Sequence, residues 1–181
     1  LNTHDPVLFF TNTGIVYELK VYKLPLGNPQ AKGRPIINLL PLSEGEKVTT
    51  MMPLPENQDN PPDLMFATRS GNVRRNPLSD FSNVKANGKI AMKLVEGDSL
   101  IGVVPCKKSD DIMFSASLGK CMRFRSNDVR LFKGRGSIGV RGIRLKSEDH
   151  VISISVLKHI QEDTDVKVLY LKAASAQRRG E

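Results

Sequence analysis

A short apolar run that ends in a glycine turn recurs three times along the chain. The three copies share the order aspartate, apolar run, turn glycine and returning segment, and they span residues 5–16, 63–73 and 111–121. In each returning segment, apolar and polar residues alternate, which is the period of a β-strand. Glycine tolerates the positive φ of a tight turn. The pattern therefore predicts three β-hairpins with turns at Gly14, Gly71 and Gly119.

A second unit follows each hairpin and adds further strands. It begins with glycine and spans residues 33–39, 88–94 and 139–145, and an acidic turn and another β-rich run follow it. About four strands per repeat and a period near 50 residues are typical of propeller-like arrays. We therefore predict an all-β fold of about three four-stranded antiparallel blades, at about residues 1–58, 59–108 and 109–158. A proline-rich linker at 53–62 separates the first two.

The last segment departs from this repeat. Asp163 is a good N-cap, and Val166, Leu169, Tyr170 and Ala173 follow at helical spacing. We interpret residues 164–178 as a helix within a truncated insertion at 159–181. Helical apolar stripes usually mean packing, so we expect this helix to pack against a neighbour.

The charge is basic and uneven. The chain has 181 residues, a net charge of +8 and a pI near 9.6. The net charge is −1 over residues 1–61, +4 over 62–109, +5 over 110–161 and zero over 162–181. This favours an acidic partner such as nucleic acid. The composition excludes a disordered polyelectrolyte, no run is long enough to span a membrane, and two cysteines indicate a reduced, cytoplasmic setting. The first residue is not Met, which indicates a piece of a longer chain.

The repeats resemble the C-terminal domain of DNA gyrase A proteins. Residues 2–5 and 33–42 resemble the first blade of that domain, residues 88–94 with Gly97-Asp98 the second, and residues 139–145 the third. The resemblance implies a β-pinwheel, a propeller variant of six blades that exchange strands. It also implies a function: such domains wrap DNA, so that the whole enzyme introduces negative supercoils using ATP.

Two departures from the family accompany this resemblance. The basic box of the family lies upstream of the first blade, before this chain begins. Gln177-Arg178-Arg179-Gly180 echoes that box, but we interpret it as a solvated helix end. The second departure is that only three of the six blades are present. Residues 158–181 are similar to a helical insertion of some bacterial members, particularly α-proteobacterial ones.

The resemblance also implies partners and the location of the chemistry. The expected partners are double-stranded DNA, the remainder of the gyrase A polypeptide and the gyrase B polypeptide, with no membrane, in the cytoplasm near the nucleoid. ATP and Mg²⁺ belong to other parts of the enzyme, so we expect no cofactor in this chain. We also expect no catalysis by this chain alone, because its tyrosines (Tyr17, Tyr22 and Tyr170) lie outside the cleavage motif and are expected to pack.

Other candidate chemical sites are weak. The three histidines have no Cys or carboxylate at metal-ligand spacing, so no metal site is expected. Cys121 takes a strand position that valine fills in the other repeats, so we expect a core thiol. Residues 134–139 spell G-x-G-x-x-G, but a strand pattern follows where a dinucleotide site needs a helix. We therefore interpret this segment as a basic loop.

DNA wrapping needs many phosphate contacts from lysine and arginine and few base contacts. The densest basic run is residues 123–144, where seven basic residues accompany one acid, Asp128. The candidate DNA-binding residues are Arg34, Arg69, Arg74, Arg75, Lys89, Lys93, Arg123, Arg125, Arg130, Lys133, Arg135, Arg141 and Arg144.

Two alternatives remain open at this point. The chain could be the corresponding domain of topoisomerase IV, which guides DNA without full wrapping. It could instead be a protein-interaction propeller with no DNA role, and then DNA binding would be absent or insensitive to salt.

Overall fold

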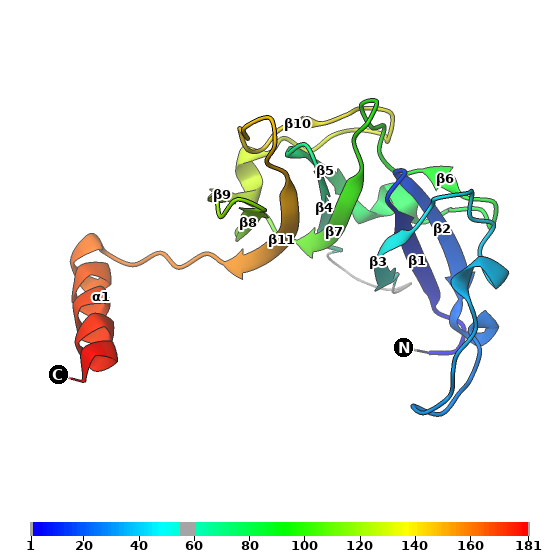
Figure 1. Cartoon of the computed structure of the whole chain (residues 1–181), viewed down its shortest axis with the longest axis horizontal. Coiled ribbons are helices and arrows are strands. Elements are labelled where there is room, and N and C mark those ends of the chain that lie inside the picture. The colour runs from blue at the N-terminus through cyan, green and yellow to red at the C-terminus, as the bar shows by residue number, and fades with distance from the viewer. Residues whose placement is uncertain (1, 55–60, 181) are drawn as a thin grey trace.

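The computed structural model describes residues 2–54 and 61–180. These residues form three antiparallel sheets that lie side by side in an open arc, with one helix at the end of the chain (Figure 1). The predicted all-β array is confirmed. Residues 55–60, the middle of the expected linker, lie outside the described residues. In the described part, no helix is long and apolar enough to span a membrane.

The first sheet combines two sequence repeats. β1 (Pro6–Thr11) and β2 (Ile15–Lys20) form the first hairpin, and β3 (Val48–Pro53) pairs with the other edge of β1. The fourth strand, β6 (Lys89–Ile90), comes from the second repeat and pairs with β2, which gives the order β3-β1-β2-β6.

The second sheet repeats this arrangement. β4 (Asp63–Thr68) and β5 (Asn72–Pro77) form its hairpin, and β7 (Leu100–Cys106) pairs with β4. Its fourth strand, β10 (Val140–Arg141), comes from the third repeat. Each of these two sheets is therefore completed by the next repeat. The blade ranges 1–58, 59–108 and 109–158 stay a proposal for the sequence repeats, because the sheets run across them.

The third sheet has three strands in the described residues. β8 (Asp110–Ala116) lies between β11 (Val151–Lys158) and β9 (Cys121–Arg125). Within residues 2–54 and 61–180, no strand covers the outer edge of β9. Cys121 is therefore exposed, and the expectation of a core thiol is wrong. The valines at this position in the other repeats are buried in the clusters between successive sheets, and their strands pair with β6 and β10; β9 has no such partner in the described residues.

Four short 3-10 helices connect the strands: η1 (Val21–Lys23), η2 (Ile36–Asn38), η3 (Leu78–Phe81) and η4 (Ser126–Asp128). η2 corrects one expectation, because the first copy of the glycine-led unit was expected to be a strand. The second and third copies form β6 and β10 by pairing with the preceding sheet. The described residues contain no earlier sheet to pair with the first copy, so it lies exposed.

The exchanged segments approach the hairpin turns closely. The amides of Ala91 and Met92 donate to the carbonyl of Gly14, and those of Gly142 and Ile143 donate to the carbonyl of Gly71. A Cβ atom at Gly71 would lie 2.7 Å from Ile143 Cγ2, and φ there is +91°. Glycine is therefore required at this turn both for its conformation and for the space it leaves.

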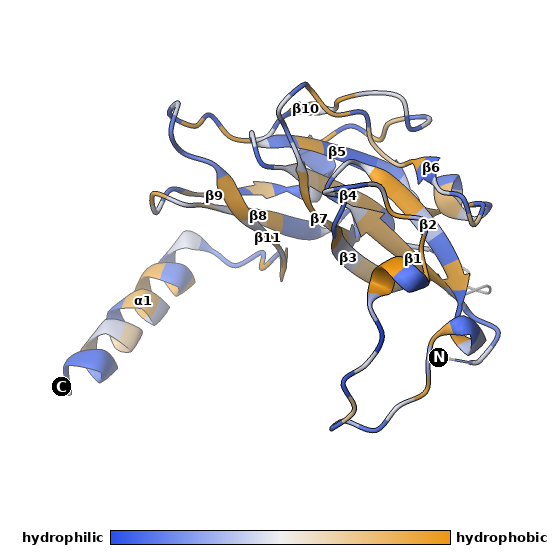
Figure 2. Ribbon diagram, turned by 45° about the vertical axis from the view of Figure 1, so that its right-hand side comes forward, coloured by the Kyte–Doolittle hydropathy of each residue, from blue (hydrophilic) through white to orange (hydrophobic). Residues whose placement is uncertain are grey.

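Apolar side chains pack between neighbouring sheets. Figure 2 shows that much of the ribbon of these strands is hydrophobic. Phe10, Phe66 and Phe81 are fully buried between the first and second sheets, with ring centroids 5.6–5.8 Å apart. A second cluster, which includes Met65 and Phe114, joins the second and third sheets. These clusters hold successive sheets face to face.

The C-terminal helix, α1 (Thr164–Arg179), begins after Asp163 and ends at Gly180, which has φ +75°. The predicted helix is confirmed, but the expected packing is not found. α1 has no buried residue and lies beyond the end of β11 (Figure 1), where one side of it lines an open pocket with Arg123 of β9 and Lys158 of β11. Tyr170 is exposed on it and Tyr22 is exposed in η1, so only Tyr17 of the three tyrosines packs as expected.

Candidate nucleic-acid interface

Most of the candidate DNA-binding side chains lie on the surface. Lys89 and Arg135 are half-buried. Nine are exposed: Arg34, Arg69, Lys93, Arg123, Arg125, Arg130, Lys133, Arg141 and Arg144. Residues 123–144, which we call the basic segment, run from β9 along one long edge of the molecule to β10 (Figure 1). The segment at residues 24–35, which contains Arg34, extends away from that edge.

Two candidates are in the interior, which corrects their assignment. Arg74 is 0% exposed and Arg75 is 4% exposed. Arg75 Nε lies 3.8 Å from Asp63 Oδ2, and its Nη1 donates to Ser126 Oγ at 3.4 Å. The alternating pattern placed Arg74 and Arg75 on opposite faces of β5, but the third repeat also packs against this strand. Both side chains are therefore removed from the proposed DNA surface.

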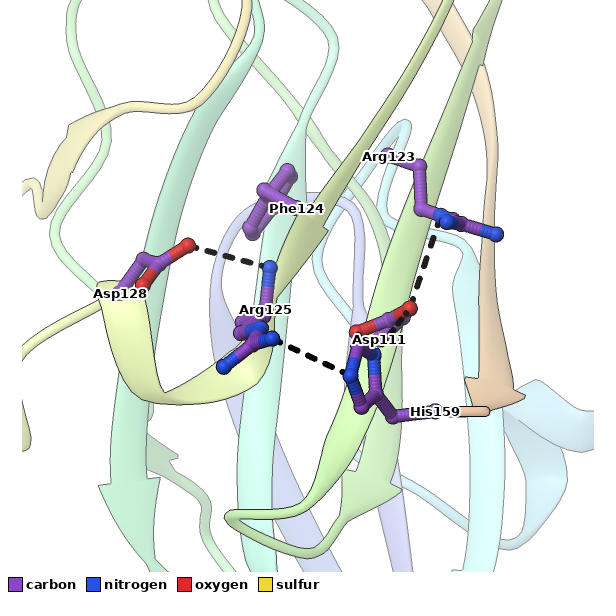
Figure 3. A pocket seen from close by; sticks show the side chains of 6 residues that line it. All are labelled: Asp111, Arg123, Phe124, Arg125, Asp128 and His159. Carbon is purple, nitrogen blue, oxygen red and sulfur yellow. Dashed lines mark hydrogen bonds and ion pairs between the residues drawn. The ribbon is translucent and has the colours of Figure 1, made fainter. Parts of the chain in front are cut away.

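Arg123 and Arg125 flank an open pocket of about 450 Å³ at the end of β9 (Figure 3). The carboxylate of Asp111, on β8, is buried at its base. Arg123 Nε lies 3.5 Å from Asp111 Oδ2, and the Arg123 side chain is 65% exposed. Asp128 accepts a hydrogen bond from the backbone amide of Arg125 at 3.2 Å. Asp111 thus anchors the Arg123 guanidinium, whereas Asp128 holds only the backbone of Arg125, and both arginines are open to solvent.

His159 is a member of this pocket that the sequence did not single out. Its Nδ1 lies 3.0 Å from both carboxylate oxygens of Asp111, and its Nε2 lies 3.2 Å from Arg125 Nη2 (Figure 3). A carboxylate accepts and a guanidinium donates, so this network assigns the proton of the neutral ring to Nδ1. Since 48 residues separate Asp111 from His159, no local motif pointed to the pair.

A second pocket brings Arg69 and Arg141 together. Arg69 lies in the turn of the second hairpin, and Arg141 lies on β10, opposite Asn72 of β5. Asp98 and Asp149 also line this pocket. Because carboxylates neighbour both arginines, this part of the basic segment is less suited to phosphate than the part around Arg123 and Arg125.

One acid in each repeat fastens the hairpin turn. Glu46 accepts from Thr13 Oγ1 and Tyr17 O–H, each at 3.1 Å. Asp98 accepts from the Ser70 amide at 2.9 Å, and Asp149 accepts from the Leu118 amide at 3.0 Å. Burial alone would raise the pKa of each carboxyl group, but these hydrogen bonds outweigh burial and hold the pKa below its ordinary value. The sequence showed the acidic turns without showing what they bind.

Other basic side chains are held by local contacts. The Arg130 guanidinium stacks over the Phe132 ring at 4.3 Å from its centroid, and Lys89 Nζ donates to the Asn83 carbonyl at 2.6 Å. The glycines of the G-x-G-x-x-G sequence lead into β10, so the interpretation as a loop before a strand is confirmed. In the described residues, no group of three or more His, Cys, Asp or Glu side chains could hold a metal ion.

Comparison with known proteins agrees with this architecture. The family described as the DNA gyrase C-terminal domain, β-propeller, matches residues 5–55, 62–107 and 110–158. The DNA gyrase A protein of Rickettsia conorii is 51% identical over 179 residues, which cover 98% of this chain and 20% of that protein. The chain therefore spans about a fifth of the length of that relative. A Rickettsia relative agrees with the expected α-proteobacterial branch.

Two solved structures share the fold. The C-terminal domain of DNA topoisomerase IV matches with a TM-score of 0.79 and 23% identity, over 88% of this chain and 49% of that one. The DNA gyrase A C-terminal domain matches with a TM-score of 0.66 and 27% identity, over 86% of this chain and 49% of that one. Because the family match covers all three repeats, this chain belongs to the DNA gyrase C-terminal domain family.

Proposed function

We propose that this chain binds double-stranded DNA without sequence specificity and wraps it along the basic segment. The observation that supports this proposal is the row of exposed arginine and lysine side chains between Arg123 and Arg144, where Asp128 is the only acid. Such a row neutralises successive phosphates and releases counterions, without reading base edges.

The wider role follows from the relatives. We propose that the chain acts within a gyrase A polypeptide in the cytoplasm, together with gyrase B, and supports ATP-dependent negative supercoiling. In this role the chain contributes DNA binding and no catalysis, while ATP and Mg²⁺ bind elsewhere in the enzyme. The 51% identity to a gyrase A protein favours this role over that of topoisomerase IV, whose matching domain is 23% identical.

The test replaces Arg123, Arg125 and Arg141 together with Gln. We expect weaker binding to two duplexes of unrelated sequence, by a similar factor for both, in fluorescence anisotropy at several salt concentrations. Each lost phosphate contact should reduce the slope of log affinity against log salt by about 0.9. In the whole enzyme, supercoiling should fall while DNA cleavage persists.

The matched control replaces Lys23, Lys32 and Lys47, three exposed lysines of the near-neutral first repeat. This triple variant should bind almost as the unchanged chain does. If the chain shows no salt-dependent binding, the protein-interaction alternative replaces the proposal. If both triple variants behave alike, the basic segment is not the DNA path.

A further inference from the structure

The buried Arg74 binds the main chain of two segments that arrive from elsewhere in the sequence. Its Nη1 donates to the carbonyl oxygens of Arg135 at 2.7 Å and Ser137 at 2.8 Å, and its Nη2 donates to the carbonyl of Ala91. The guanidinium carbon lies 5.1 Å from the centre of the Phe66 ring. Burial lowers the pKa of Arg74 to about 10, which leaves the group charged at neutral pH.

The three acceptors belong to the connections that complete neighbouring sheets. Ala91 directly follows β6, the strand that the second repeat gives to the first sheet. Arg135 and Ser137 precede β10, the strand that the third repeat gives to the second sheet. One side chain on β5 therefore bonds to both connections. A guanidinium suits this place because it carries five donors in a fixed planar fork.

The loop that Arg74 holds is the middle of the basic segment. Lys133 is exposed and Arg135 is half-buried. A Cβ atom at Gly139, at the end of the loop, would lie 2.3 Å from the carbonyl oxygen of Val73, so the loop lies directly on β5. Arg135 Nη1 is buried and has no hydrogen-bond partner, so the bonds from Arg74 fix where the exposed Lys133 emerges.

The residues at the position of Arg74 in the other two repeats support its role in holding the incoming chain segment against the sheet. Tyr17 and Met122, like Arg74, follow the turn glycine by three residues. Tyr17 is buried, and its ring lies against Gly88, at the start of the connection that arrives there. Met122 is 42% exposed, on a sheet to which the described residues supply no such connection.

We propose that Arg74 is a positioning residue for DNA binding, which contacts no DNA and holds the loop at residues 133–138 so that Lys133 faces the phosphates. The inference rests on the proposed function for its DNA part. The attachment of the loop to Arg74 is separate and can be tested without DNA.

The test compares Arg74→Met and Arg74→Lys with the unchanged chain. Met keeps much of the side-chain length but donates no hydrogen bond, whereas Lys keeps the charge with a different set of donors. We expect amide hydrogen exchange at residues 134–138 to be at least tenfold faster in Arg74→Met, and faster by a smaller factor in Arg74→Lys. Exchange in β1 and β11 should not change. Arg34→Met, at an exposed arginine, is the control.

The DNA arm is a double-mutant cycle of Arg74→Met with Lys133→Gln. Lys133→Gln alone should lower the affinity and reduce the salt slope. Arg74→Met should lower affinity in the unchanged chain but add no further loss once Lys133 has been replaced. Independent, additive losses would overturn the positioning role. If the unchanged chain binds no DNA at any salt concentration, the proposed function fails, and the exchange result alone then decides whether Arg74 holds the loop.

If neither Arg74 variant folds, a measurement on the unchanged chain can still test whether Arg74 is bonded to the loop. The Nη protons of Arg74 should exchange slowly enough to be seen by NMR at neutral pH, whereas those of exposed Arg34 should not. Fast exchange of the Arg74 protons, or unchanged exchange at residues 134–138 in a folded Arg74→Met variant, would overturn the inference.

Discussion

Asp98 shows how one carboxylate ties the parts of a repeat together. It accepts hydrogen bonds from the Ser70 amide and hydroxyl and from the Ser99 amide, so it joins the hairpin turn to the start of β7. Glu46 and Asp149 do the same in the other repeats. These bonds need the ionised carboxylate, which makes the turns sensitive to acid.

The first prediction concerns pH. Hydrogen bonds hold the pKa of Asp98 below its ordinary value in the folded chain, despite burial. Its ionised form therefore stabilises the fold fully above the unfolded pKa of about 3.9, and this contribution is lost as the pH falls through the lower, folded value. Asp98→Asn should reduce the free energy of unfolding at pH 7 and make it less dependent on pH below 4. Urea denaturation at pH 7 and pH 3 measures both effects, and an unchanged pH dependence would contradict the prediction.

The second prediction concerns the two thiols. Burial raises the pKa of Cys106 to about 11, whereas Cys121 is exposed on β9. Because the thiolate is the reactive form, Cys121 should react with Ellman's reagent at pH 8 and Cys106 should not until the chain unfolds. Cys121→Ser should remove the fast reaction, and Cys106→Ser should leave it. Equal rates for the two thiols in the folded chain would contradict this prediction.

Single residues were the hardest level to predict from sequence. The basic character of residues 123–144 was predictable, because a dense run of arginine and lysine residues can be seen in the sequence without knowledge of the fold. Arg74 and Arg75 have the same chemistry, but the third repeat buries them. Alternation along one strand says nothing about what packs on either face. His159 and Asp111 were missed for the related reason that only the folded sheet brings them together.

At the scale of elements, the three hairpins were predictable because their signal is local: an apolar run, a turn glycine and a returning strand. β6 and β10 were recognisable as part of the repeat, but not the sheet that each one joins. These two-residue strands form because a neighbouring β-strand supplies the pairing partner. The first copy lacks such a partner in the described residues and forms η2 instead.

The third prediction tests the seating of an exchanged element. Gly139 and Gly119 have nearly the same φ, +81° and +82°, but only Gly139 lies against β5. Substitution by alanine at either position should cost about 1–3 kcal/mol for the backbone conformation. Gly139→Ala should cost more than Gly119→Ala, because its Cβ also meets the Val73 carbonyl. Urea denaturation compares the two variants, and equal losses would count against tight seating of the connection.

At the scale of the whole molecule, the described array is an open arc with unequal ends. Its first sheet receives a strand from the repeat that follows, whereas its third sheet has an uncovered β9 edge in the described residues. Met122 and Leu118 are exposed near that edge. Uncovered strand edges pair readily with other chains.

The fourth prediction is that this chain associates through β9 at high concentration. Sedimentation equilibrium should show an average mass that rises with concentration. Met122→Lys places a charge on the edge strand and should shift the equilibrium towards monomer. Leu26→Lys, at a fully exposed position in the segment at residues 24–35, is the control and should leave association unchanged. A monomer at every concentration, or an equal effect of both substitutions, would refute the role of β9.

Because a later repeat supplies the fourth strand of an earlier sheet, the sheets should be completed in a fixed order during synthesis. During synthesis, the first sheet has its own three strands once Pro53 has emerged, but it is closed only by residues 89–90. The second sheet likewise waits for residues 140–141. Each of these two sheets can therefore be completed only after the following repeat has been synthesised. A damaging substitution in one glycine-led unit should appear as a defect in the sheet made before it.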